Sequence, residues 1–200
     1  MITKKILDAQ IFAFQLHANQ FYGDPELKIP YTVHLAMVES KAQKYLYLLP
    51  EKDKETAIIS IWLHDSREDQ GLSYNDIKKL FGLESADVVY YLTNNDGKNR
   101  KEKAINTYGP KTSKNRITVF DKLADRLGNV EFGIHYNSRM LKTQKEEFPY
   151  MVEILFVPGE FDIMWTDLAD MLGIPDPVKN PELYTIKGHL YNNKEMEIQL

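Results

Sequence analysis

Residues 64–69 gather an imidazole and three carboxyl groups in six positions: His64, Asp65, Glu68 and Asp69. The mostly apolar run before them, 57–63, predicts a buried helix. Residues four apart share a helix face, so His64 is expected above Glu68 and Asp65 above Asp69. Carboxylates this close repel one another unless a cation neutralises them. The pattern therefore indicates a divalent-metal site with a proton acceptor, although a helix that merely reaches solvent gives the same pattern.

Two other segments can supply further ligands. A site of this kind takes ligands from more than one helix and leaves positions open for water and substrate. His34 lies in 30–38, where the apolar residues keep helical spacing. Asp125 lies in 120–129, another helical pattern, where it shares a polar edge with Asn129. Each residue alone would be structural or merely solvated, but together with His64 and Asp65 they form a candidate ligand set.

The order His34, His64–Asp65, Asp125 resembles the HD phosphohydrolase superfamily. The surrounding sequence resembles its (p)ppGpp hydrolase branch, represented by the hydrolase domains of RelA and SpoT proteins and by small stand-alone SpoT homologues. The matching blocks are 12–20, 30–34, 63–69, 77–82, 91–93 and 122–129, within a likeness that covers residues 8–155. Their order and spacing are more specific than any one block.

The resemblance implies an all-α fold, the HD-domain helical bundle, and a nucleotide substrate. It implies a manganese ion held by His34, His64, Asp65 and Asp125, with Glu68 and Asp69 acting on the nucleophilic water. A bound divalent ion acidifies water and polarises a phosphoryl oxygen, and an adjacent carboxylate can take the proton. The implied reaction is hydrolytic removal of the 3′-pyrophosphate of (p)ppGpp.

Four side chains are expected to meet the substrate: Tyr22, Arg67, Arg100 and Asn129. The residue corresponding to Asn129 lies in the substrate pocket of this family. Tyr22 follows the first block where guanosine-specific relatives carry a basic residue, so it can stack on a purine but supplies no cation. Arg67 replaces an apolar residue of the family, and either clamps a phosphate or pairs with Asp65, Glu68 or Glu39.

Arg100 belongs to a basic segment within a chain of net charge −4. The segment, 98–116, contains Lys98, Arg100, Lys101, Lys103, Lys111, Lys114 and Arg116. It predicts an electrostatic funnel for a small polyphosphate, with a solvated loop as the alternative. Net acidity and the lack of a long basic face argue against nucleic acid as a ligand.

Length and composition fit one enzyme domain, since 200 residues with 43% hydrophobic and 27% charged are ordinary for a globular protein. We expect an HD domain over 1–157, then a helix at 161–172 and an arm or hairpin around 182–191, with 158–200 packed on the same domain. Within the domain, helices are expected near 3–22, 31–48, 53–67, 73–80, 84–93, 98–107, 113–132 and 138–156. The absence of cysteine and of any bilayer-length apolar run fits a cytoplasmic protein without a membrane partner. The sequence leaves homo-oligomer formation open.

Two other functions stay open. The lost basic residue near Tyr22 favours an HD phosphohydrolase for another small nucleotide, such as ppApp, a dNTP or a nucleoside monophosphate. A catalytically idle HD domain could instead bind a nucleotide as a sensor. A sensor needs no water-activating pair, so the retained Glu68 and Asp69 favour an enzyme.

Overall fold

The computed structural model describes residues 2–23, 25–94, 97–136 and 139–184 of the chain. Almost all of its regular structure is helical, which confirms the predicted all-α bundle. The helices are α1 (Lys4–Leu16), α2 (Tyr31–Tyr45), α3 (Glu51–Leu63), α4 (Ser66–Gln70), α5 (Tyr74–Phe81), α6 (Leu83–Leu92), α7 (Arg100–Tyr108), α8 (Arg116–Tyr136), α9 (Arg139–Leu155) and α10 (Asp162–Leu172). Two short strands, β1 (Phe21–Tyr22) and β2 (Ile29–Pro30), pair antiparallel.

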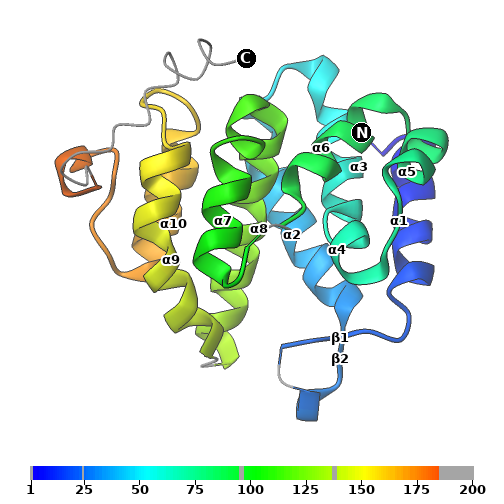
Figure 1. Cartoon of the computed structure of the whole chain (residues 1–200), viewed down its shortest axis with the longest axis horizontal. Helices are drawn as coiled ribbons and strands as arrows, with labels where there is room; N and C mark the ends of the chain where they lie inside the picture. The colour runs from blue at the N-terminus through cyan, green and yellow to red at the C-terminus, as the bar shows by residue number, and fades with distance from the viewer. Residues whose placement is uncertain (1, 24, 95–96, 137–138, 185–200) are drawn as a thin grey trace.

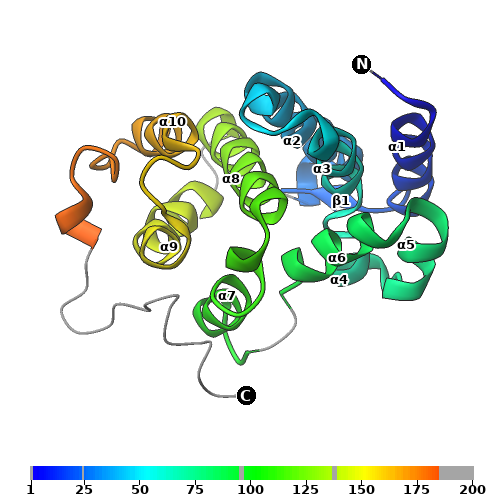
Figure 2. The same cartoon turned by 90° about the horizontal axis from the view of Figure 1, so that it is seen from above.

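Helix α8 is the centre of the bundle. It lies between α2 and α3 on one side and α9 and α10 on the other, as Figure 2 shows from above. Helix α7 packs on α9, while α1 packs on α3 and α5 on α6 at the far end of the molecule (Figure 1). Because α8 is covered on several sides, even its charged residues Asp121, Lys122, Asp125 and Arg126 are buried.

Local sequence signals explain where several helices begin and end. The side chains of Thr3, Ser73 and Asn99 accept hydrogen bonds from backbone N–H groups in the first turns of α1, α5 and α7. Gly71 and Gly173 end α4 and α10 in the left-handed conformation that glycine adopts without a steric penalty. These caps satisfy backbone groups that the helices themselves cannot pair.

Two predicted helix ranges are wrong in ways that matter for the site. The first helix ends at Leu16 rather than near 22, because Phe21 and Tyr22 turn into β1 and the Gln20 carbonyl accepts a 2.9 Å hydrogen bond from Tyr31 N. The predicted helix 53–67 divides into α3 and α4, so His64 and Asp65 lie at a junction. Asp65 has ψ near zero, and the Ser66 hydroxyl donates to the Leu63 carbonyl at 2.6 Å.

The described part of the C-terminal region continues the same bundle. Helix α10 packs on α8 and α9. Residues Pro181–Tyr184 form a 3-10 turn, in which the Tyr184 ring lies edge-on to Phe148. The predicted arm or hairpin around 182–191 starts in this turn, and its remainder, within 185–200, lies outside the described residues.

In the described part of the chain, no helix combines the length and apolar character needed to cross a bilayer.

Candidate metal centre and substrate cavity

The four predicted ligands meet at the interface of α2, the α3–α4 junction and α8. Ligand atoms of His34, His64 and Asp125 all lie within 4.8 Å of one another, and all three residues are buried. The Nε2 atoms of the two histidines are 3.3 Å apart, and Asp125 Oδ1 is 3.6 Å from His34 Nε2 and 3.7 Å from His64 Nε2. Asp65 Oδ2 lies 2.8 Å from His64 Nε2 and 3.6 Å from His34 Nε2. Two imidazoles and two carboxylates at these separations can hold a borderline divalent ion.

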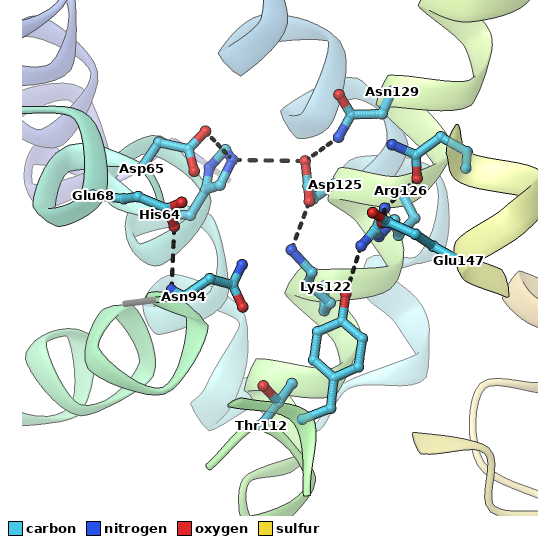
Figure 3. Close-up of polar contacts among 12 residues, drawn as sticks. His64, Asp65, Glu68, Asn94, Thr112, Lys122, Asp125, Arg126, Asn129 and Glu147 are labelled. Atoms are coloured by element: carbon cyan, nitrogen blue, oxygen red, sulfur yellow. Dashed lines mark hydrogen bonds and ion pairs between the residues drawn. The ribbon is translucent and has the colours of Figure 1, made fainter. Parts of the chain in front are cut away.

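Neighbouring groups hold three of these side chains in place. His64 Nδ1 lies 2.7 Å from the Ile61 carbonyl, which directs Nε2 toward the other ligands. The Tyr31 hydroxyl donates to Asp65 Oδ2. Asp125 accepts from Asn129 Nδ2 at 2.6 Å through Oδ1 and from Lys122 Nζ at 3.0 Å through Oδ2 (Figure 3). His34 differs, because its Nδ1 is buried without a hydrogen-bond partner among the described residues.

The cluster attracts positive charge strongly. Burial alone would lower the pKa of His64, but the carboxylates of Asp65 and Asp125 outweigh it and raise that pKa to about 9. Burial alone would raise the pKa of Asp125, but Lys122 and the two imidazoles hold it at about 2. The pKa of Asp65 is likewise held well below its usual range by His64 and His34 against the effect of burial. A divalent ion at this position would take over the role of the His64 proton.

Three residues of the ligand cluster, His34, Asp65 and Asp125, line a cavity of about 420 Å³, and His64 lies behind them. Four cationic side chains also line it: Arg100 and Lys103 from α7, and Lys122 and Arg126 from α8. Figure 3 shows Asp65, Glu68 and Asn94 on one side, facing Lys122, Asp125, Arg126 and Asn129 on the other. This volume lies within the range of small-molecule sites. The cavity can therefore place an anionic ligand between a metal centre and a cationic wall.

Of the two predicted catalytic carboxylates, the structure brings only Glu68 to the cavity. Glu68 lines the cavity wall and accepts a 3.1 Å hydrogen bond from Asn94 N. Partial burial raises the pKa of the Glu68 carboxyl. Asp69 is exposed, does not line the cavity, and accepts from Gln20 Nε2 at 2.6 Å. The structure therefore places Glu68, but not Asp69, among the residues that line the cavity.

Three of the four predicted substrate residues line the cavity: Tyr22, Arg100 and Asn129. Arg67 does not, and the prediction that it clamps a phosphate has no support in the geometry. Its guanidinium carbon lies 5.2 Å from the centre of the Tyr90 ring, and none of the proposed carboxylate partners forms an ion pair with it in the described residues. Of these two neighbours on α4, only Glu68 lines the cavity, while the Arg67 guanidinium is partly buried beside Tyr90.

The chain resembles known proteins in structure rather than in sequence. No family model matches the chain. No curated protein matches it in sequence. Among solved structures it matches a metazoan orthologue of SpoT that hydrolyses ppGpp and plays a role in starvation responses, with a TM-score of 0.66 at 19% sequence identity over 88% of this chain and 99% of that one.

This chain has the SpoT-orthologue fold. The resemblance predicted from the sequence is thus confirmed for the fold. Within this SpoT-like fold, sequence reasoning missed Lys122 and Arg126 as part of the cavity wall. The spacing of Lys122, Asp125, Arg126 and Asn129 could have revealed them, because positions i, i+3, i+4 and i+7 form one stripe on a helix.

Sequence reasoning found Arg100 but also missed the residues of α7 and α9 that pair with Arg100 and Arg126 in the cavity wall, and for these the sequence carries no indication. Arg126 Nη1 forms a 2.6 Å ion pair with Glu147 Oε2, Nη2 donates to the Tyr108 hydroxyl at 2.5 Å, and Nη1 also donates to Gln144 Oε1. Arg100 Nε donates to Glu147 Oε1 at 2.7 Å. These partners come from α7 and α9, so only the packing of α7 and α9 beside α8 brings them together.

Proposed function

We propose that the protein is a metal-dependent phosphohydrolase that removes the 3′-pyrophosphate of (p)ppGpp, with Mn²⁺ as its metal. The observation that carries this proposal is one cavity in which the cluster residues His34, Asp65 and Asp125, with His64 beside them, share the lining with Lys122, Arg126, Arg100 and Lys103. A substrate with two separated phosphate groups fits such a cavity, because one group can approach the ligand cluster while another meets the cationic wall. The SpoT-like fold supports the same substrate class.

The ligand set fits a divalent ion by its own chemistry. Two imidazoles disfavour a strictly oxygen-preferring ion, while the mixed set of two imidazoles and two carboxylates suits an ion such as Mn²⁺. A divalent ion bound here would polarise a phosphoryl oxygen and acidify an adjacent water. The hydrogen bonds to His64, Asp65 and Asp125 hold their ligand atoms in the required directions before any ion arrives.

The residues around the cluster can then perform the hydrolysis. Glu68, with its raised pKa, accepts a proton from the attacking water, whose oxygen bonds to the phosphorus. The bond from that phosphorus to the ribose 3′ oxygen breaks, and the proton returns to the departing oxygen. Arg100 and Lys103 neutralise phosphate charge at the other side of the cavity. Asp125 holds Lys122 by a 3.0 Å hydrogen bond, so this ammonium also faces the reacting end of the substrate.

A second candidate is a phosphohydrolase for another small nucleotide. The observation that favours it is the burial of Tyr22, which is 6% exposed and hydrogen-bonded to Asn129. A ring held in this way is not free to stack on a purine base. Recognition of guanine would then depend on the cavity residues of α7 and α9. An idle nucleotide sensor is less favoured, because Glu68 lies on the cavity wall where a proton acceptor is needed.

The test measures release of phosphate and of pyrophosphate from ppGpp, ppApp, dNTPs and nucleoside monophosphates, with Mn²⁺ or with a chelator. We expect Mn²⁺-dependent release from ppGpp by the wild type, and its loss in His64→Ala. His135→Ala is the matched control, because His135 is exposed and does not line the cavity. Preference for another nucleotide would support the second candidate function instead of (p)ppGpp hydrolysis. No turnover of any substrate, with Mn²⁺ bound, would contradict the enzyme proposal and favour the nucleotide sensor.

A further inference from the structure

Tyr22 is held in a closed aromatic environment beside the ligand cluster. Its ring stacks on His34 with 4.4 Å between ring centres and a 20° interplanar angle. Phe132 packs edge-on against the other side of the ring at 4.5 Å, and Tyr31 lies edge-on at 5.8 Å. The side chain is therefore fixed by neighbours on several sides, unlike a ring that opens toward a ligand.

The hydroxyl of Tyr22 is connected to the ligand Asp125 through the side chain of Asn129. It donates a 2.5 Å hydrogen bond to Asn129 Oδ1, and Asn129 Nδ2 donates a 2.6 Å hydrogen bond to Asp125 Oδ1. Asp125 Oδ1 is the oxygen that lies 3.6 Å from His34 Nε2. One tyrosine thus contacts a ligand of α2 with its ring and fixes a ligand of α8 through one amide.

His34 needs such support more than the other ligands do. His64 is oriented by the Ile61 carbonyl and Asp65 by the Tyr31 hydroxyl, whereas His34 Nδ1 has no hydrogen-bond partner among the described residues. Metal-binding histidines usually gain their orientation from a partner at the second ring nitrogen. Here the stacked Tyr22 ring takes the place of that partner.

We infer that Tyr22 is a positioning residue for the metal ligands His34 and Asp125 rather than a platform for the nucleotide base. This inference rests on the proposed metal site, and it replaces the substrate contact that the sequence predicted for Tyr22. The ring restricts rotation of the His34 imidazole, and the hydroxyl fixes the amide that orients Asp125.

The experiment measures the Mn²⁺ dissociation constant of the full chain by calorimetry for the wild type, Tyr22→Phe and Tyr45→Phe. Tyr45→Phe is the matched control, since Tyr45 is buried on the same helix as His34, donates its hydroxyl to Asp167 and does not line the cavity. Loss of a partner that orients a ligand typically weakens metal binding about tenfold to a hundredfold. We expect that loss in Tyr22→Phe, an unchanged constant in Tyr45→Phe, and an unchanged KM for the nucleotide at saturating Mn²⁺.

A double-mutant cycle separates this role from a general loss of packing. Asn129→Ala removes the amide between the hydroxyl and Asp125, so Tyr22→Phe should weaken Mn²⁺ binding little further in its presence. Additive losses would overturn the inference, as would an unchanged Mn²⁺ constant with a raised KM in Tyr22→Phe. Either result leaves the proposed function standing. Failure of the wild type to bind Mn²⁺ would overturn the proposed metal site and this inference together.

Discussion

Glu68 and Asp69 are adjacent carboxylates with different surroundings. Glu68 lies on the cavity wall with a raised pKa, and Asp69 lies outside it beside Gln20. A positioned proton acceptor contributes roughly 10²–10⁴-fold to the rate of such a reaction. We therefore expect Glu68→Gln to lower kcat by that factor while Mn²⁺ binding persists, because glutamine keeps the size of the side chain but accepts no proton.

Asp69→Asn is the matched control for Glu68→Gln. It makes the same isosteric change one residue along α4, so we expect a much smaller fall in kcat than for Glu68→Gln. The measurement is single-turnover pyrophosphate release with Mn²⁺ saturating in both variants. Equal losses in the two variants would contradict the separation of roles and would indicate that Asp69 turns inward when the substrate binds.

For individual residues, the sequence predicts well which residue types bind a metal, but it predicts the directions of side chains poorly. His34, His64, Asp65 and Asp125 could be found because metal chemistry restricts which residue types can serve. Arg67 and Asp69 could not be separated from Glu68, which alone of the three lines the cavity, and the packing that holds the Tyr22 ring comes from residues distant in the sequence. A change of one position on α4 or β1 turns a side chain from the cavity to the surface or into the core.

The β1–β2 hairpin is the element that delivers Tyr22 to the ligand cluster. Gly23 follows Tyr22 with φ +74°, and a Cβ atom at Gly23 would lie 2.7 Å from two ring carbons of the buried Phe132. Phe132 is also the ring that packs on Tyr22. We expect Gly23→Ala to destabilise the protein by about 1–2 kcal/mol from the left-handed backbone, with about 1–3 kcal/mol more from overpacking. Because the shift reaches Tyr22, Mn²⁺ binding should weaken as well.

Gly173→Ala isolates the backbone contribution to that change. Gly173 has φ +63° at the end of α10, and apart from its chain neighbours no atom lies within 4 Å of the position that a Cβ atom would take there. Thermal unfolding of both variants should show the larger fall in Tm for Gly23→Ala, with Mn²⁺ affinity altered there alone. Equal falls in Tm would mean that Phe132 moves aside at no cost and that the hairpin tolerates a side chain at Gly23.

The helices could be predicted more completely than their arrangement. Apolar periodicity and caps located most of the helices, but the first helix was extended across β1 because Phe21 and Tyr22 continue its apolar pattern. The burial of Lys122 and Arg126 was unforeseen for a different reason. Charged residues at helical spacing are typical of an exposed face, and only the packing of several helices around α8 buries them.

The whole molecule carries a net charge of −4, yet its cavity is nearly balanced. Four cationic side chains line it, and so do the four carboxylates Asp65, Glu68, Asp125 and Glu147. Glu147 is engaged by Arg100 and Arg126, which lowers its pKa against the effect of burial and keeps it ionised at neutral pH. A divalent ion would therefore give the cavity its excess of positive charge, so an anionic substrate should depend on the metal for binding and not only for chemistry.

This dependence can be measured on the intact protein by thermal unfolding. Mn²⁺ at a hundred times its dissociation constant stabilises the folded state by about 2.7 kcal/mol, a rise in Tm of roughly 5–10 °C for a domain of this size. We expect pyrophosphate to raise Tm further when Mn²⁺ is in excess over it, and to have little effect with a chelator. In His64→Ala both shifts should disappear, because the ion is no longer held. A pyrophosphate shift that is equally large without Mn²⁺ would contradict the dependence, and would mean that Arg100, Lys103 and their neighbours bind the anion unaided.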